Sequence, residues 1–143
     1  MFYNIYTAVK NQLTTQIAAL KGVEWYNVQY EGAIASTPRV FVEFPEKLEI
    51  SQLTKQTRRA PLRMRLHVVS VAVASHEGVI PDSTAQEHET IALAAKDAID
   101  KFTPLSGAEK LTTPMQLTGW QHFHKHKGWM VTFVEFEGKI SLP

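Results

Sequence analysis

The chain has 143 residues, of which 44% are hydrophobic and 10% aromatic, and this length and composition fit one compact domain with a substantial core. Its 15 basic and 14 acidic residues leave a formal net charge of +1, which argues against non-specific binding of nucleic-acid phosphates and against a basic membrane anchor. The chain has no cysteine, so disulfides, thiol catalysis and thiolate metal sites are excluded.

Residues 4–20 are predicted to form an amphipathic helix. Their apolar residues step by three or four positions and make one stripe: Ile5, Val9, Leu13, Ile17 and Leu20. Gly22 follows, where glycine ends a helix at little cost. The N-terminal sequence lacks the charged start and unbroken apolar run of a signal peptide, and no stretch approaches the length of a membrane span, so we expect a protein made and used in a cytosol.

Three strands are predicted next, in the segments VEWYNVQYEG, RVFVEFPEKLEI and LRMRLHVVSVAVA. Pro45 interrupts the second strand and places it near an edge or at a bend. A polar segment, SQLTKQTRRAP, precedes the third strand and is predicted to be an extended loop. The third strand alternates between two faces, with Leu62, Met64, Leu66 and Val68 on one and Arg63, Arg65, His67 and Val69 on the other.

A second helix and a hairpin complete the chain. Ser83 with Gln86, or Thr84 with Glu87, are the candidate capping boxes. The predicted buried side of this helix carries Ile91, Ala95, Ile99 and Phe102. The segments MQLTGWQHFHKHK and WMVTFVEFEGKIS are predicted to form a hairpin that turns near Lys127 and Gly128. The order α-β-β-β-α-β-β predicts a single α+β domain over residues 1–143, with a mostly antiparallel sheet of about five strands and two main helices.

The tetrapeptide FVEF occurs twice, at residues 41–44 and 133–136. Similar packing demands on two strands explain the repeat more simply than an internal duplication, because β-rich tetrapeptides recur easily. Each copy has large apolar side chains on both faces of its strand, with a carboxylate beside them. Two short helices are not expected to cover both faces of the sheet, so the second face is predicted to associate with another copy of the chain. The alternative is that the helices divide between the faces or that long loops cover the second one.

The histidines of HFHKH are the candidate metal ligands. His122, His124 and His126 project from the same face of a predicted strand, at a spacing that suits zinc or nickel. The competing interpretation is a polar strand end, because no carboxylate is placed to orient the imidazoles. The sequence has no nucleophile elbow, His-Glu-x-x-His motif or glycine-rich phosphate loop. We therefore expect neither catalysis nor a cofactor, and we interpret Glu87-His88-Glu89 as a solvated first turn of a helix.

Basic residues gather in and after the long polar loop. Lys55, Arg58 and Arg59 lie within it, and Arg63 and Arg65 follow on the next strand. A solvated loop explains the first three residues taken singly. Taken together they make a candidate arm that orders on a partner, either an acidic protein surface or passing nucleic acid.

The sequence also resembles a known family over nearly its whole length. The resemblance is carried by IYTAVKNQLTTQIAAL, TPRVFVEF, RMRLHVVSVAVAS, AQEHETIALAAKDAIDKF and WMVTFVEFEGKI, in that order. The order of these segments and their patterns of apolar and polar residues are similar to those of the tail terminator and tail completion proteins of long-tailed bacteriophages. No diagnostic motif accompanies the likeness, and other subunits of the head–tail neck have similar size and composition.

The resemblance implies a structural role in a virion, with assembly in the host cytoplasm. Such proteins form a ring, usually of six subunits, on the head-proximal end of the tail tube. The ring stops polymerisation of the tube protein and then contacts the neck of the filled head, and DNA passes through its lumen without specific binding. Neither catalysis nor a cofactor is involved. A different neck or connector subunit, or a small metal-binding module built on the three histidines, are the alternatives.

The resemblance would assign two regions of the chain to assembly. The loop at residues 51–61 would contact the tube or a neighbouring subunit. The second sheet face would be the subunit interface, with Phe41, Glu43, Phe133, Glu135, Arg63 and Arg65. Arginines facing a DNA channel would be unfavourable unless Glu43 or Glu135 neutralises them.

Overall fold

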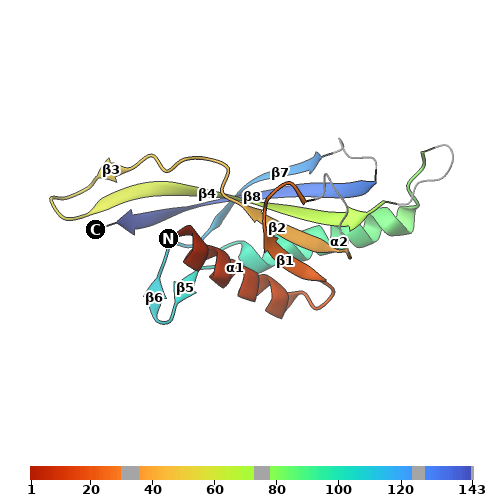
Figure 1. The fold of residues 1–143 in the computed structure, drawn as a ribbon, viewed down its shortest axis with the longest axis horizontal. Coiled ribbons are helices and arrows are strands. Elements are labelled where there is room, and N and C mark those ends of the chain that lie inside the picture. Colours follow the sequence, from red (N-terminus) through yellow and green to blue (C-terminus); the bar gives the residue numbers. More distant parts are fainter. Residues whose placement is uncertain (30–35, 73–77, 124–127, 143) are drawn as a thin grey trace.

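The computed structural model describes residues 1–29, 36–72, 78–123 and 128–142 (Figure 1). Within these ranges, two long helices and eight strands follow one another. Their bounds are α1 Phe2–Gln16, β1 Gly22–Trp25, β2 Arg39–Glu43, β3 Ser51–Gln52, β4 Arg58–Val71, α2 Asp82–Ile99, β5 Leu105–Ser106, β6 Glu109–Lys110, β7 Gln116–Phe123 and β8 Trp129–Leu142. The α+β class is confirmed, and the predicted order is recovered with three two-residue strands added to it.

One six-stranded sheet organises the molecule. Its main path runs β1-β2-β4-β8-β7, and β3 pairs with β4 outside this path. All neighbours are antiparallel except β1 and β2, which are parallel, so the sheet is mixed. The strands β4 and β8 pair over their full 14 residues, from Arg58 opposite Leu142 to Val71 opposite Trp129. This pair is the central ribbon to which the other strands are added.

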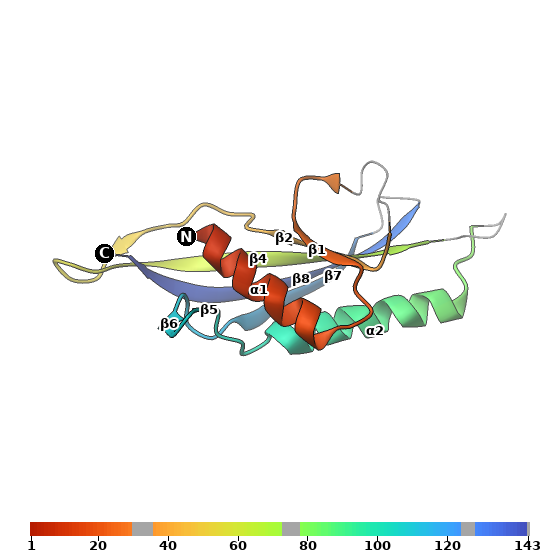
Figure 2. The same ribbon diagram turned by 60° about the horizontal axis from the view of Figure 1, so that its bottom comes forward.

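Both helices lie on the same face of this sheet, as Figure 2 shows. The core between them is built from the predicted stripe of α1 (Ile5, Val9, Leu13), from alternate residues of β4 (Leu62, Met64, Leu66, Val68) and from matching residues of β8 and α2 (Val134, Phe136, Ala92, Ala95, Ile99). Each of the larger side chains, which excludes the two alanines, contributes about 1.5–3 kcal/mol when it leaves water. The alternative prediction, that one helix covers each face of the sheet, is therefore wrong.

Several boundaries differ from the prediction. Helix α1 ends at Gln16, and Gly22 belongs to β1 instead of terminating the helix. Strand β2 stops at Glu43, two residues before Pro45, which has no N–H to donate to a sheet. The predicted polar loop is largely a hairpin, because Ser51 and Gln52 pair with Arg59 and Arg58. Arg58 and Arg59 are thus strand residues.

Helix α2 begins at Asp82, directly after Pro81, and none of the predicted capping side chains bonds its first turn. Asp82 supplies the acidic group that favours a helix N-terminus. Ala95 and Ile99 are buried as predicted, whereas Ile91 and Phe102 are only partly buried. Within the described parts of the chain, no helix is both long enough and apolar enough to cross a membrane.

A buried histidine links α2 to the sheet. His88 is only 3% exposed, and its Nδ1 and Nε2 each lie 2.8 Å from a hydroxyl, that of Ser70 on β4 and that of Thr132 on β8. Burial, with a smaller contribution from the nearby His122, lowers the pKa of His88 to about 4. The imidazole is therefore neutral at pH 7. The sequence-based interpretation of residues 87–89 as a solvated turn is wrong for His88, because this side chain is buried.

The stability of the fold is expected to fall as the pH drops from about 6.5 through 4. The unfolded chain binds a proton at His88 below about pH 6.5, whereas the folded chain resists it until about pH 4, so protonation favours unfolding in that window. The loss for this one group is on the order of 3 kcal/mol. Urea unfolding at pH 7.0, 5.5 and 4.5 measures it.

The matched variant is His88→Gln, which keeps an amide near both hydroxyls but does not titrate. Its unfolding free energy should change less between pH 7.0 and 4.5 than that of the unaltered chain. Equal pH dependence in the two proteins would contradict a neutral buried His88.

Candidate assembly surface

The face of the sheet opposite the helices, here called the open face, carries the residues that the sequence singled out for subunit contact. Strand pairing places Glu43, Arg65 and Glu135 in one row across β2, β4 and β8. Phe41, His67 and Phe133 form the next row. The sequence-predicted residues are thus brought together as cross-strand neighbours, because side chains two apart on a strand share a face.

The aromatic row is sheltered within the protomer. Phe41 is 0% and Phe133 7% exposed, in a second small cluster with Val69 and Val131. Phe123 stacks on Phe133 with ring centroids 4.7 Å apart. A single copy therefore does not present Phe41 or Phe133 for contact, contrary to the expectation from the sequence, because partly buried aromatic side chains pack over them.

His67 also belongs to this sheltered row. The ring of Tyr26 stacks on it at 4.0 Å, and its Nε2 lies 2.5 Å from Oε2 of Glu43. Burial lowers the pKa of His67 to about 4, although the hydrogen bond with Glu43 acts in the opposite direction. His67 is therefore neutral at pH 7, and its Nε2–H donates to the carboxylate.

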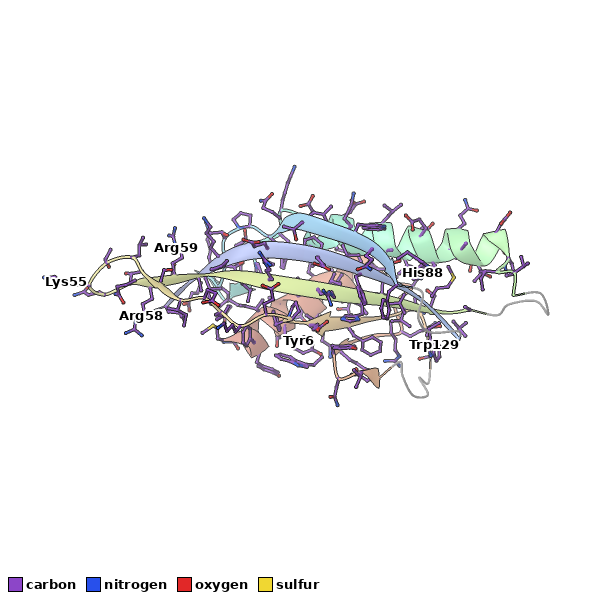
Figure 3. All side chains as sticks on the ribbon, turned by 90° about the horizontal axis from the view of Figure 1, so that it is seen from above. Tyr6, Lys55, Arg58, Arg59, His88 and Trp129 are labelled. Carbon is purple, nitrogen blue, oxygen red and sulfur yellow. The ribbon has the colours of Figure 1, made fainter. Side chains whose placement is uncertain are left out.

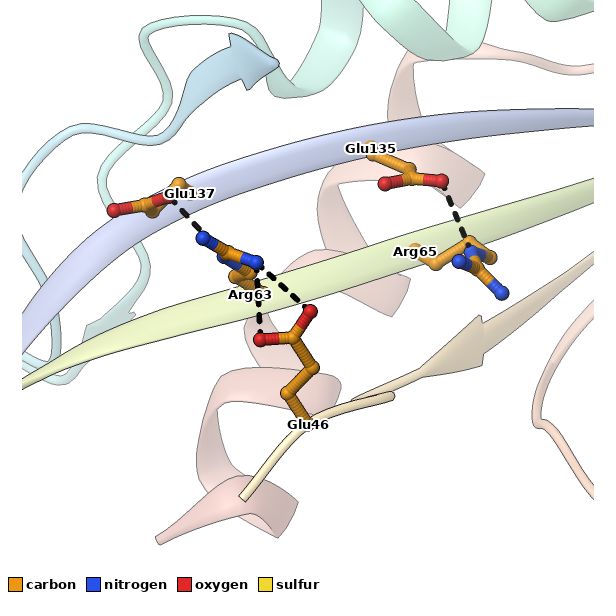
Figure 4. Close-up of polar contacts among 5 residues, drawn as sticks. All are labelled: Glu46, Arg63, Arg65, Glu135 and Glu137. Carbon is orange, nitrogen blue, oxygen red and sulfur yellow. Dashed lines mark hydrogen bonds and ion pairs between the residues drawn. The ribbon is translucent and has the colours of Figure 1, made fainter. Parts of the chain in front are cut away.

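Arg65 lies between two carboxylates. Its Nε is 3.2 Å from Oε1 of Glu135 (Figure 4). A terminal nitrogen of the same guanidinium is 3.7 Å from Oε2 of Glu43. The guanidinium also lies over the ring of Phe133, 4.7 Å from its centroid. The same side chain thus covers part of the aromatic cluster and balances the two acids that the FVEF repeats place beside it.

Arg63 has a similar arrangement one row further along β4. It makes two hydrogen bonds of 2.8 and 3.0 Å to Glu46, and its Nε lies 3.4 Å from Oε2 of Glu137 (Figure 4). Sequence reasoning missed both partners. Glu137 was recognisable because it lies two positions after Glu135 on the same strand face, whereas Glu46 reaches Arg63 from the connection after β2, which no strand periodicity predicts.

The predicted basic arm is a projecting hairpin, residues 51–59, at one end of the molecule (Figure 3). Lys55, Arg58 and Arg59 are all exposed, and within the described ranges none of them forms an ion pair. The Thr54 hydroxyl oxygen accepts the backbone N–H groups of Gln56 and Thr57, at 3.2 and 3.0 Å. The arm is therefore an ordered turn that presents three uncompensated positive charges.

The histidine strand is described only in part. His122 lies on β7 opposite Thr132, on the side of the sheet that faces the helices. His124 and His126 lie outside the described residues, so the predicted joint metal site is not tested. Among the residues that are described, no group of three or more histidine or acidic side chains is placed to hold a metal ion.

No protein-family model matches the sequence, and no curated protein matches it. The fold is similar to that of a chain from a solved structure entitled "Virion of native gene transfer agent (GTA) particle". The two chains share 12% sequence identity with a TM-score of 0.63, and the match covers 98% of this chain and 99% of the other. At this identity the likeness establishes a shared fold over the full length of both chains.

Replacing Phe133 is expected to destabilise the protomer itself. Phe133→Ala removes a buried ring that contacts Phe123, His67 and Arg65, and should lower the free energy of unfolding by about 3 kcal/mol. Phe133→Glu should cost more, because it buries a charge. Urea denaturation measures both.

Tyr3→Ala is the matched control, because Tyr3 is 68% exposed and its loss should change stability by less than about 0.5 kcal/mol. If Phe133→Ala were equally harmless, the aromatic cluster of the open face would not be part of the protomer's core.

Proposed function

We propose that this protein is a structural subunit of a phage-like virion, and more specifically a tail terminator that forms a ring on the head-proximal end of the tail tube. The observation that carries the proposal is the full-length match in fold to a chain of a gene transfer agent virion, since neither chain has a substantial part that the other lacks. The sequence resemblance to tail terminators narrows the role within the particle.

The charges of the open face support a channel through which DNA passes. Arg63 and Arg65 are both engaged by carboxylates, and the two arginines are outnumbered by Glu43, Glu46, Glu135 and Glu137. His67 adds no charge at pH 7 because burial lowers its pKa to about 4. Arginines that are already paired with carboxylates attract phosphates only weakly, so the two arginines that looked unfavourable beside DNA are compatible with a conduit.

A role without catalysis agrees with how the histidines are used. His88 bonds two hydroxyls inside the core, and His67 is stacked against Tyr26 and bonded to Glu43. Hydroxyls occupy both ring nitrogens of His88, so no carboxylate bonds the ring to orient it as a general base toward Ser70. Under this proposal the partners are further copies of the chain, the tail tube protein and a connector of the head or neck.

Assembly predicts a defined mass. The subunit weighs 16.1 kDa, so a closed ring of six would weigh about 97 kDa. Light scattering after size exclusion, across a range of protein concentrations and in the presence of purified tube protein, measures it. A chain that stays monomeric at every concentration and leaves tube ends bare in electron micrographs would contradict the ring.

The tail length of particles made without this chain separates a terminator from a neck subunit. A missing terminator leaves tube growth unchecked, so tails should be longer than normal and unattached to heads. A missing neck subunit should leave detached tails of normal length, and that outcome would overturn the terminator assignment while keeping the virion role. Particles complemented with the intact chain are the control.

A further inference from the structure

The strongest unassigned feature is the outer edge of β7. This strand, Gln116–Phe123, is the last one on its side of the sheet, and within the described residues it pairs only with β8 (Figure 1). Six of its eight residues are exposed. Alternate residues of an edge strand direct their backbone N–H and C=O groups away from the sheet, where another strand can pair with them.

The opposite edge of the sheet is closed within the chain. β1 has only four residues, and two of its carbonyl oxygens already accept hydrogen bonds from side chains. That of Val23 accepts the Tyr6 hydroxyl at 3.3 Å, and that of Trp25 accepts Nε2 of Gln29 at 2.7 Å. β3 contributes only two residues, at the base of the arm. The described sheet therefore has one closed edge and one open edge.

Features that keep edge strands of soluble proteins apart are nearly absent from β7. Its sequence, QLTGWQHF, has no proline and no Lys, Arg, Asp or Glu, whereas β1, β2, β4 and β8 each carry at least one such charged residue. A register shift lies between Leu117 and Gly119, and the backbone N–H of Leu117 donates to Oδ1 of Asp100 at 3.2 Å. Both features lie at the beginning of the strand and leave the part around Trp120 unprotected.

The same strand exposes large apolar side chains. Leu117 is 38% and Trp120 39% exposed. They lie opposite Phe136 and Val134 of β8, so both project to the side of the sheet that carries the helices. An open strand edge with apolar side chains beside it is the kind of surface to which a further strand adds.

We propose that β7 pairs with β7 of a second copy, antiparallel and about a two-fold axis near Trp120, so that the two sheets become continuous. The occupant is a second copy because β7 is complementary to itself: the two strands have equal length, and an uncharged strand brings no like charges together. The axis lies near Trp120 because the contact with Asp100 already engages the backbone of Leu117. The two Trp120 side chains then project from the same side of the joined sheet, where their rings can stack.

The pairing goes beyond the proposed ring and does not depend on it. A two-fold contact uses the same surface of both copies and closes on itself, whereas the contacts of a ring are head-to-tail. The pairing gives a dimer of about 32 kDa when the subunits are free, and it joins two rings back to back when rings form.

Charges introduced at Trp120 test the pairing. Trp120→Lys and Trp120→Glu each bring like charges together across the axis, so each should raise the dissociation constant of the dimer at least about tenfold. An equimolar mixture of the two variants pairs opposite charges, and the dimer should return. Sedimentation velocity across a range of protein concentrations measures all three samples.

The control variant is Leu105→Lys, which adds the same charge at a side chain that is 47% exposed on β5, outside the six-stranded sheet. It should dimerise as the unaltered chain does. Circular dichroism and thermal unfolding establish that every variant remains folded, as expected from the exposure of the altered side chains.

Cysteine cross-linking locates the axis, because the chain has no cysteine of its own. Under mild oxidation Trp120→Cys should give a disulfide-linked dimer, since strand pairing brings residue 120 of the two copies within about 6 Å. Gln116→Cys is the control on the same strand: at about 3.4 Å per residue, residue 116 of the two copies lies about 27 Å apart, too far for a disulfide. Non-reducing gel electrophoresis measures both variants.

The outcomes separate this inference from the proposed function. A chain that caps tube ends but never dimerises, a Trp120→Lys variant that dimerises normally, or equal cross-linking at residues 116 and 120 would overturn the pairing and keep the ring. Loss of rings in Trp120→Lys would assign β7 to the ring contact, and loss of tube-protein binding would assign it to that partner; either result overturns the two-fold pairing. Dimers that never form rings, even on tube ends, would support the pairing and contradict the ring.

Discussion

The pairing of β4 with β8 over 14 residues each is the constraint on which the rest of the structure depends. This ribbon places alternate side chains of both strands toward the helices, where Leu62, Met64, Val134 and Phe136 form the core. The same alternation forces Arg63, Arg65, Glu135 and Glu137 onto the open face as direct cross-strand neighbours. The ends of the ribbon also support the arm, because β3 adds to β4 only where β4 extends beyond β2. A core, a charged surface and a projecting arm thus follow from one strand register.

The open face is divided by charge and burial. At one end the aromatic cluster around Phe41 and Phe133 is closed by Tyr26, Phe123 and Trp129, so its apolar area is largely satisfied within one copy. In the middle, Arg63 and Arg65 each lie between two carboxylates, at N–O distances of 2.8 to 3.7 Å. Assembly through exposed phenylalanines is therefore not what this surface offers. The basic arm differs from this face, because within the described ranges no ion pair engages Lys55, Arg58 or Arg59.

Much of the fold was accessible from local patterns. The apolar stripe of α1, the two faces of β4 and the closing hairpin were predicted correctly because periods of 3.6 and 2 residues report directly on burial. The capping of α2 and the polar loop were predicted wrongly. In the first case Pro81 and Asp82 begin the helix without a capping side chain, and in the second the edge of β4 recruits Ser51 and Gln52 into a short strand. Sheet edges recruit residues whose own preferences for strand structure are weak, so local propensity does not reveal them.

By itself the sequence determined the α+β class, the absence of cysteine chemistry, and which residues of each strand share a face, because composition and alternation are local properties. Only the tertiary structure decided that both helices cover the same face, that Phe41 and Phe133 are sheltered, and that Glu46 reaches Arg63. These facts depend on contacts between residues far apart in the chain, and strand order and loop paths bring such residues together without leaving a periodic signal.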